Sequence, residues 1–191
     1  PNGVDTSLFK PMKIKKEKNS LIFVGRLTKQ KNLESLIKAI SKLDVTLYIV
    51  GDGELREKLE KLAKEFKSNV KFLGNVPNNE IPKLLNKCEI FILPSLYEGM
   101  PKALLEAMSC GMAVIASRIE AHKRIIDDGV DGVLCETEPK DIREKIIYLL
   151  SNPELRERLG KNARKKIVEK YSIENQANSQ IEILIKTLKF K

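Results

Sequence analysis

The sequence is poor in the residues from which metal sites, disulfide frameworks and membrane spans are built. Of its 191 residues, none is tryptophan, one is histidine, three are cysteine and 5% are aromatic. The single histidine, His122, excludes a histidine-rich metal site. The cysteines (Cys88, Cys110 and Cys135) lack C-x-x-C spacing, so we expect buried, reduced thiols in a cytosolic protein. No apolar run approaches the roughly 20 residues that a membrane span needs.

What is present fits one globular domain with a basic surface. Hydrophobic residues make up 42% and charged residues 32% of the chain, which is long enough for a sizeable core. The net charge of +9, from 35 Lys and Arg against 26 Asp and Glu, favours a phosphorylated or polyanionic partner or an acidic membrane surface. A solvated lysine-rich surface explains the same charge. The chain begins at Pro1 without a signal-peptide pattern, so we expect a fragment of a longer protein.

Short apolar runs alternate with amphipathic helical patterns over most of the chain. The strand candidates are residues 21–25, 46–51, 70–74, 90–95, 113–117 and 132–135. Their apolar character is nearly continuous, which is typical of strands buried on both faces of a parallel sheet. Apolar stripes at helical spacing lie between them, for example over 33–43 and 55–66. The alternation predicts an α/β fold: a Rossmann-like, doubly wound parallel sheet of about six strands with helices on both faces.

The two ends of the chain differ from this alternating core. Residues 1–19 are rich in turn residues and then in lysine, which indicates a linker. After residue 136 the pattern is helical only, and a last helix from about Ser172 carries Ile181, Leu184 and Leu188. We therefore predict a linker at 1–19, a Rossmann-like domain at 20–171 and a C-terminal helix at 172–191.

Ligands of open parallel α/β sheets bind beyond the carboxyl ends of the strands, so the loops after the strands are candidate sites. The first loop, "GRLTKQKN" (25–32), begins at Gly25 and carries Arg26 and Lys31. An arginine fork and a lysine ammonium together can hold a diphosphate. Ordinary basic residues on a solvated loop would show the same pattern.

The loops after the second and third strands are weaker candidates. "VGDGELRE" (50–57) resembles the start of a dinucleotide fingerprint, but Arg56 stands where the third glycine belongs. Gly51 and Gly53 are therefore expected to form a tight strand-to-helix turn. "FLGNVPNNE" (72–80) either presents backbone groups and an apolar face at Val76 to a base, or forms a plain turn.

The segment "YEGMPKALLEAMSCG" (97–111) places two glutamates eight positions apart around a helix start. Pro101 suits the first helical turn, beside the positive end of the helix. The amides expected to be free there belong to Gly99, Met100 and Lys102. A phosphate or a sugar hydroxyl is a natural occupant. Glu98 stands at the rim and Glu106 projects from the second turn, unless both are plain surface charges.

Taken together, these loops resemble the donor-binding half of the retaining glycosyltransferases of family 4, the "group 1" enzymes with GT-B architecture. The motifs "GRL…KN", "VGDGELRE", "VKFLGNV", "LPSLYEGMPKALLEAMSCGMAVIAS" and "DGVDGVL" occur in the family's order. Glu98 and Glu106 match the family's E-x7-E signature, and the resemblance runs from "PNGVD" to about residue 185. It implies the C-terminal half of a GT-B fold.

The resemblance also implies a role for each site residue. Arg26 and Lys31, next to Gly25, would hold the donor diphosphate and stabilise the charge that grows on it as the glycosidic bond breaks. Glu98 would contact the donor sugar near the reacting carbon, and Glu106 would accept hydrogen bonds from the ribose hydroxyls. The other implied contacts are made by the backbone of Gly99, Met100, Pro101 and Lys102 to sugar or phosphate oxygens, and by the backbone near Val76 to the base.

Two features separate this chain from common members of that family. Relatives often carry GG-x-x-E after the "VIAS" strand, whereas here Glu120 and Ala121 replace the glycines and Arg124 replaces the glutamate. These changes bear on donor or acceptor preference. The sequence contains no D-x-D motif, so neither a metal–carboxylate clamp nor another cofactor is expected. The donor substrate is expected to be a UDP- or GDP-sugar.

The resemblance further implies an N-terminal acceptor domain outside these 191 residues, toward which the helix at 172–191 would cross. We expect these residues alone to bind nucleotide weakly and to transfer no sugar. The implied partners are a nucleotide-sugar donor and an acceptor glycan or lipid-linked sugar, in the cytoplasm, with peripheral membrane association of the full-length protein allowed. The rivals are a nucleotide-sugar epimerase or phosphorylase of the same fold and a nucleic-acid-binding module, for which 5% aromatic residues give few stacking platforms.

Overall fold

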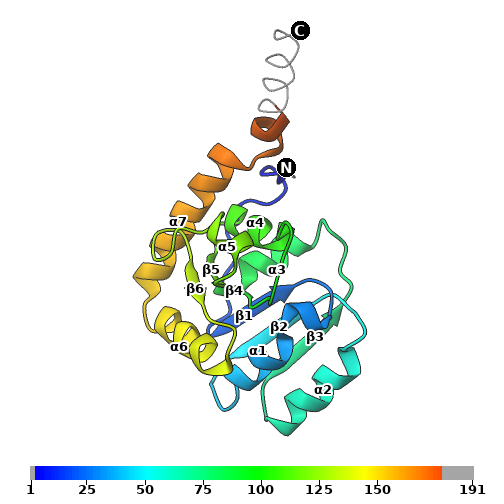
Figure 1. The fold of residues 1–191 in the computed structure, drawn as a ribbon. Coiled ribbons are helices and arrows are strands. Elements are labelled where there is room, and N and C mark those ends of the chain that lie inside the picture. The colour runs from blue at the N-terminus through cyan, green and yellow to red at the C-terminus, as the bar shows by residue number, and fades with distance from the viewer. Residues whose placement is uncertain (1–2, 178–191) are drawn as a thin grey trace.

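The computed structural model describes residues 3–177, in which six parallel strands alternate with helices (Figure 1). The strands are β1 Ser20–Val24, β2 Thr46–Val50, β3 Val70–Gly74, β4 Ile90–Leu93, β5 Ala113–Ser117 and β6 Val133–Cys135. The helices are α1 Leu33–Ala39, α2 Arg56–Glu65, α3 Ile81–Lys87, α4 Lys102–Ser109, α5 Glu120–Lys123, α6 Pro139–Leu150 and α7 Pro153–Lys170, with a 3₁₀ turn, η1, at Lys29–Lys31. The five strand–helix alternations and the sixth strand confirm the predicted fold.

The sheet has the strand order β3-β2-β1-β4-β5-β6, and every neighbouring pair is parallel. The chain moves outward from β1 to β3, then returns through α3 to place β4 on the other side of β1. Strand order therefore reverses between β1 and β4. In doubly wound sheets, the loops at this switch point diverge and leave room for a ligand. The loops after β1 and β4 carry the predicted Arg26, Lys31 and Glu98.

The helices lie in two groups, one on each face of the sheet. Right-handed crossovers place helices on opposite faces when the chain winds outward in both directions. Helix α1 packs against α2 and α6, while α4 packs against α3 and α7. Figure 1 shows α6 and α7 beside β6 and β5, which they contact. None of the helices in residues 3–177 is both long enough and apolar enough to cross a membrane.

Burial differs among the strands of the sheet. All residues of β1, β4, β5 and β6 are buried, as the continuous apolar runs predict. The prediction of burial on both faces is wrong for β3, in which Lys71 and Leu73 are exposed. Strand β3 lies at one edge of the sheet, whereas β6, at the other edge, is packed against α6 and is fully buried, so edge position alone does not decide burial. The three cysteines are buried free thiols, as predicted.

The N-terminal segment packs closely although it contains no helix or strand of the sheet. Val4 and Phe9 are buried in the core, and Val4 forms a parallel bridge with Ser172. Figure 1 accordingly shows the N-terminus beside the far end of α7. Residues 173–177 are helical, which agrees with the start of the predicted C-terminal helix. The rest of that helix, with Ile181, Leu184 and Leu188, lies outside the described residues.

Candidate functional site

A cavity of about 260 Å³ opens at the carboxyl edge of the sheet, at the switch point between β1 and β4. It is lined by Val24, Gly25, Arg26, Thr28, Gln30, Lys31, Leu93, Glu98, Met100, Pro101, Lys102 and Ala103. The structure therefore brings together most of the predicted site residues. Gly99, Glu106 and Val76 are outside this lining.

The glycines after β2 support the loop that carries Arg26. A Cβ atom on Gly51 would lie 2.1 Å from the carbonyl oxygen of Gly25, and one on Gly53 would lie 2.6 Å from that of Leu27. The Leu27 amide also donates to the Asp52 carbonyl at 2.9 Å. The "GDG" sequence thus forms the tight turn that was expected, and its function is to let two loops approach closely.

The side chains of Lys31 and Glu98 form a largely buried ion pair. Lys31 Nζ lies 2.5 Å from Glu98 Oε1, with 17% and 6% of the two side chains exposed. The same oxygen accepts a hydrogen bond from Ser95 Oγ at 2.7 Å. Glu98 Oε2 has a weaker contact, with Gln30 Nε2 at 3.4 Å. Oε1 therefore already has two close partners, whereas Oε2 can still accept a hydrogen bond from a ligand.

Gln30 ties the two loops together at the backbone as well. Its side-chain Nε2 donates to the Tyr97 carbonyl at 2.8 Å. Its backbone carbonyl accepts a hydrogen bond from the Leu96 amide, also at 2.8 Å. The relative placement of Lys31 and Glu98 is thus fixed without a ligand. Sequence reasoning missed Gln30 and Ser95; the buried polar Ser95 directly after an apolar strand was the available signal.

Arg26 and Lys102 are the exposed cations of the cavity, and Lys102 is paired with Glu106. Within residues 3–177, no hydrogen bond or ion pair joins the Arg26 side chain to another residue. Its five N–H donors are available to a ligand. A free guanidinium beside a lysine is suited to a bidentate oxyanion such as a phosphate.

The start of α4 differs in one respect from the prediction. Its first helical residue is Lys102, with Pro101 at the N-cap position. The Lys102 amide, expected to be free, donates instead to the Met100 carbonyl at 2.9 Å. The tight turn at Pro101 folds the chain back far enough for this bond. The amides of Gly99 and Met100 have no hydrogen-bond partner among the described residues.

Glu106 is buried in the second turn of α4, with 7% of its side chain exposed and Lys102 Nζ 3.8 Å away. Burial raises the pKa of the Glu106 carboxyl to about 7, against the lowering effect of Lys102. A buried carboxyl without strong donors gains from a ligand that supplies hydroxyl groups. Val76 follows β3 and is partly buried against the core.

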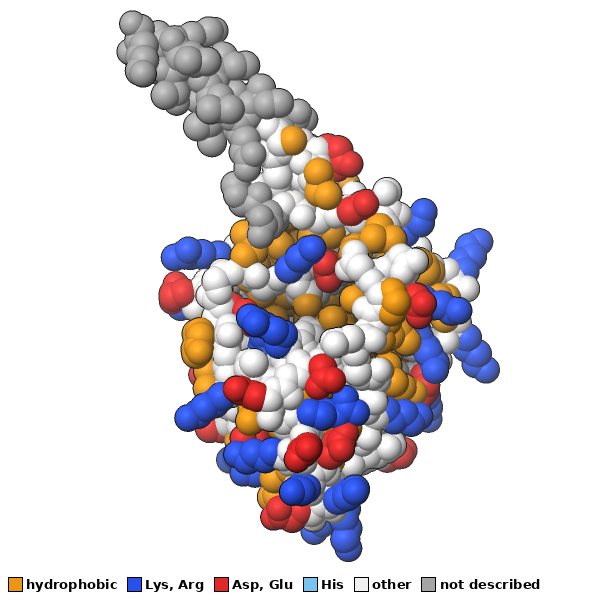
Figure 2. Space-filling model, turned by 90° about the vertical axis from the view of Figure 1, so that its right-hand side faces the viewer, with side chains coloured by type: hydrophobic (Ala, Val, Ile, Leu, Met, Phe, Trp, Pro, Cys, Tyr) orange, Lys and Arg blue, Asp and Glu red, His pale blue; other side chains and the backbone are white. Residues whose placement is uncertain are grey.

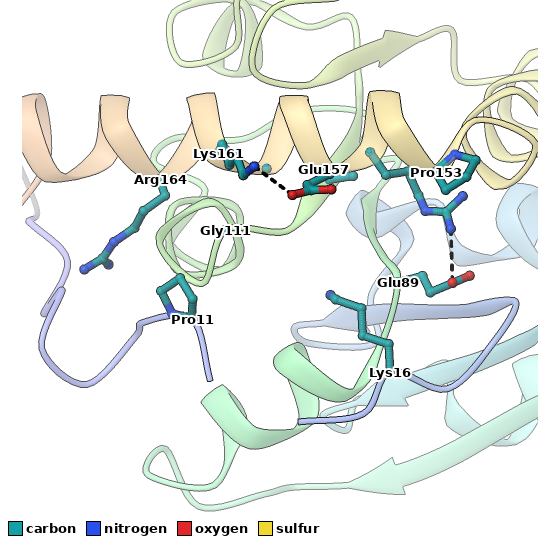
Figure 3. A pocket seen from close by; sticks show the side chains of 11 residues that line it. Pro11, Lys16, Glu89, Gly111, Pro153, Glu157, Lys161 and Arg164 are labelled. Carbon is teal, nitrogen blue, oxygen red and sulfur yellow. Dashed lines mark hydrogen bonds and ion pairs between the residues drawn. The ribbon is translucent and has the colours of Figure 1, made fainter. Parts of the chain in front are cut away.

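A larger cavity, of about 540 Å³, lies at the opposite, amino edge of the sheet, between α7 and the N-terminal segment (Figure 3). Its charged groups are occupied by the protein itself. Arg156 pairs with Glu89 at 3.1 Å, and Lys161 pairs with Glu157 at 2.7 Å. Arg164 points toward the N-terminal segment in Figure 3, where it donates to the Phe9 carbonyl at 2.8 Å. Size alone therefore does not identify the functional site.

The positive charge is distributed rather than concentrated on the face seen in Figure 2. Lys and Arg side chains are spread over that face with Asp and Glu side chains among them. This distribution favours a solvated basic surface on that face. The described residues contain no group of three or more His, Cys, Asp or Glu side chains placed to hold a metal ion.

Comparison with known protein families matches residues 4–166 to the family described as glycosyl transferases, group 1. An uncharacterized glycosyltransferase of Methanocaldococcus jannaschii is 37% identical over 155 residues, which are 80% of this chain and 44% of that protein. The Escherichia coli UDP-Gal:α-D-GlcNAc-diphosphoundecaprenol α-1,3-galactosyltransferase is 35% identical over 194 residues, covering 91% of this chain and 50% of that protein.

Among solved structures, the C-terminal domain of a glycosyl transferase group 1 family protein from Francisella tularensis superposes with a TM-score of 0.80. It is 28% identical, and the match covers 90% of this chain and all of that domain. The chain spans about half the length of the curated relatives it matches.

Proposed function

Because this chain belongs to the group 1 glycosyl transferases, we propose that it is the donor-binding half of an enzyme that moves a sugar from a nucleotide-diphosphate sugar to an acceptor. The observation that carries the proposal is the cluster of Arg26, Lys31 and Glu98 at the switch point. The fold holds Lys31 and Glu98 in place, while Arg26 and Glu98 Oε2 keep unused hydrogen-bonding capacity.

In this proposal, Arg26 and Lys31 bind the diphosphate. The guanidinium supplies a planar pair of donors, and the lysine supplies a point charge. As the glycosidic bond breaks, negative charge grows on the leaving diphosphate. A cation already fixed beside it, as Lys31 is, stabilises that charge without reorganisation, which lowers the barrier. Lys31 is fixed by Glu98 at 2.5 Å before any donor arrives.

Glu98 and the turn after it bind the sugar. Glu98 Oε2, with its 3.4 Å contact to Gln30, accepts a hydrogen bond from a sugar hydroxyl near the reacting carbon. The amides of Gly99 and Met100 donate to sugar or phosphate oxygens, and Pro101 shapes the turn that presents them. Lys102 contributes its side chain rather than its amide.

Glu106 and the loop at Val76 bind the nucleoside. Ribose hydroxyls donate to the Glu106 carboxylate, and these bonds favour its charged form. The backbone near Val76 contacts the base of a UDP- or GDP-sugar. The reaction proceeds without a metal and with retention of configuration at the sugar.

The acceptor is a glycan or a lipid-linked sugar, held by an N-terminal domain. Support comes from the E. coli relative, whose name gives a diphosphoundecaprenol-linked acceptor. We further propose that the full-length protein acts on this acceptor in the cytoplasm, at the membrane surface. The family match favours sugar transfer over the epimerase and phosphorylase alternatives, and the mixed charge of the viewed face gives no support to nucleic-acid binding.

The test is sugar transfer by the full-length protein, with UDP- and GDP-sugars offered together with a lipid-linked acceptor. We expect release of one nucleoside diphosphate that depends on the acceptor, and a product with the donor's anomeric configuration by NMR. Glu98→Gln should abolish transfer, whereas the exposed Lys29→Met control should not. Conversion of the nucleotide-sugar without an acceptor would contradict the proposal.

A further inference from the structure

The loop after β5 departs from the glycine-rich pattern of the family, and its structure shows which side chain matters there. Glu120 is paired with Lys123 at the surface, and Arg124 is exposed. Arg118 binds Asp128 at 2.8 Å on the protein surface. His122 is the one residue of α5 that is buried, with no exposed area.

The imidazole of His122 turns back onto the end of β5. Nδ1 lies 2.8 Å from the Ser117 carbonyl oxygen and 3.2 Å from Ser117 Oγ. A carbonyl oxygen only accepts, so Nδ1 must carry the proton. Nε2 is fully buried and has no hydrogen-bond partner among the described residues. A proton on Nε2 would therefore be an unsatisfied buried donor, which favours the neutral Nδ1–H tautomer.

The contacts continue from Ser117 to the candidate site. Ser117 Oγ donates to the carbonyl oxygen of Ser95, across the β4–β5 pair. Ser95 Oγ in turn donates to Glu98 Oε1 at 2.7 Å, the oxygen that binds Lys31. Ser95, Ser117 and His122 all have no exposed area. Each member of this series is thus constrained by its neighbours and shielded from water.

We propose that His122 is a positioning residue of the donor site: its Nδ1–H fixes the carboxyl end of β5, and Ser117 and Ser95 transmit that constraint to the Glu98 carboxylate. The name donor site rests on the proposed function, whereas the constraint itself is a property of the fold. A neutral imidazole suits this position because it donates one directed bond and adds no charge beside Glu98 and Lys31. Burial likewise lowers the pKa of His122; the hydrogen bond to Ser117 and the charge of Glu98 oppose this effect, and Lys31 reinforces it.

The single histidine makes the first test unambiguous. A long-range ¹H–¹⁵N NMR spectrum of the 191-residue chain should show one neutral imidazole, protonated at Nδ1, at neutral pH. The Ser95→Ala variant should keep that tautomer, because it removes the hydrogen bond from Ser95 Oγ to Glu98 and leaves the contacts between His122 and Ser117 intact. An imidazolium, or a proton on Nε2, would overturn the proposal.

Two matched substitutions then separate the ring nitrogens. Asparagine places an amide nitrogen at the position of Nδ1, and glutamine places one at the position of Nε2. We expect His122→Asn to keep the hydrogen bond to the Ser117 carbonyl and with it the positioning of Glu98. His122→Gln should lose both. Thermal unfolding of each variant, alone and combined with Glu98→Gln, measures the energetic coupling between positions 122 and 98. Losses in Tm for His122→Gln and Glu98→Gln should be smaller together than their sum, because linked sites are not additive.

Nucleotide affinity gives a second readout on the same variants. His122→Gln and Ser95→Ala should each weaken binding by about tenfold, a normal coupling within one hydrogen-bond network, and His122→Asn should weaken it less. Additive losses in Tm, or a stronger defect in His122→Asn than in His122→Gln, would overturn the positioning role. The proposed function is tested separately, by sugar transfer with the full-length protein, and the tautomer and the coupling decide this inference whatever that result is.

Discussion

Strand β4 has a partly buried ion pair at each end, and the two pairs differ in what else their atoms contact. At the amino end, Glu89 binds Arg156, with 15% of each side chain exposed. At the carboxyl end, Glu98 binds Lys31, with 6% and 17% exposed. By burial and charge the two pairs are alike, and the cavity beside the first is about twice as large, at about 540 Å³ against about 260 Å³.

The amino-end pair is saturated by the protein's own backbone. Arg156 donates to the carbonyls of Leu149 and Leu150, at 2.6 and 2.8 Å, at the end of α6. The second oxygen of Glu89 accepts the Asn19 amide at 2.9 Å. These bonds join α7, α6 and the segment before β1. The pair is therefore structural, whereas the carboxyl-end pair keeps a weakly used Oε2 and a neighbouring free guanidinium.

The largest effect should follow from breaking the amino-end pair. Arg156→Met leaves Glu89 and two helix-terminal carbonyls without their donor. Removing one member of a buried pair costs about 3–5 kcal/mol, and with 15% exposure we expect about 3 kcal/mol of unfolding free energy. Urea unfolding measures this loss. The Lys161→Met control, on the same helix and 74% exposed, should change stability by less than about 0.5 kcal/mol. Equal effects of the two substitutions would remove the distinction drawn between the pairs.

Glu106→Gln should produce a pH-dependent gain in stability. The folded-state pKa of about 7 lies above the unfolded value near 4.5, so the folded state binds more protons between these values. Stability from protonated Glu106 is present below about pH 4.5 and is lost as pH rises through about 7. The amide removes this loss, so the variant should gain up to about 3 kcal/mol at pH 8, at 1.36 kcal/mol per pKa unit. Unfolding at pH 5 and pH 8 measures the difference, and equal gains at both would contradict the assignment.

Arg26→Met should separate binding from stability. Its side chain has no partner within residues 3–177, so unfolding free energy should change by less than about 0.5 kcal/mol. Loss of a charged hydrogen bond to phosphate should weaken nucleotide binding by about 2 kcal/mol, or roughly 30-fold. Calorimetric titration measures the affinity. Lys29→Met, which removes an exposed charge on the same loop, is the matched control and should lose much less.

The smallest effect is expected at Lys102, which is 63% exposed and 3.8 Å from Glu106. Lys102 lowers the pKa of Glu106. Lys102→Met should therefore raise that pKa above about 7, with a change in stability of less than about 1 kcal/mol because exposed pairs contribute little. A ¹³C titration of the Glu106 carboxyl follows the shift, and a lowered pKa would be inconsistent with the contact.

The sequence predicts the sheet well because local signals and tertiary burial agree there. Strands β1, β4 and β5 have continuous apolar runs, and all three lie inside the sheet. Strand β3 was expected to be buried in the same way, yet its exposure depends on which helices cover it, and periodicity within the strand does not report that. The close approach of Gly51 to Gly25 is likewise a contact between two loops, which the sequence pattern does not report. The glycine itself did indicate a tight turn.

The sequence indicated several of the residues that line the cavity at the switch point, but not the contacts between them. Loop position and the resemblance together indicate Arg26, Lys31 and Glu98, and the structure places all three in one cavity. The pairing of Lys31 with Glu98 and the role of Gln30 depend on two loops that are 67 positions apart in the chain. His122 carried no signal beyond being the only histidine, because its role depends on burial against β5.

The most direct test of the central claim is nucleotide binding to the 191-residue chain and to two variants, one at each edge of the sheet. Titrations with UDP, GDP, ADP and phosphate would be followed by thermal shift, because a ligand at about 100 times its dissociation constant adds about 2.7 kcal/mol of stability. The account predicts that one nucleotide raises the Tm, that Arg26→Met loses the shift and that Lys161→Met keeps it. A shift that survives Arg26→Met and disappears in Lys161→Met would place the ligand at the amino edge and contradict the account.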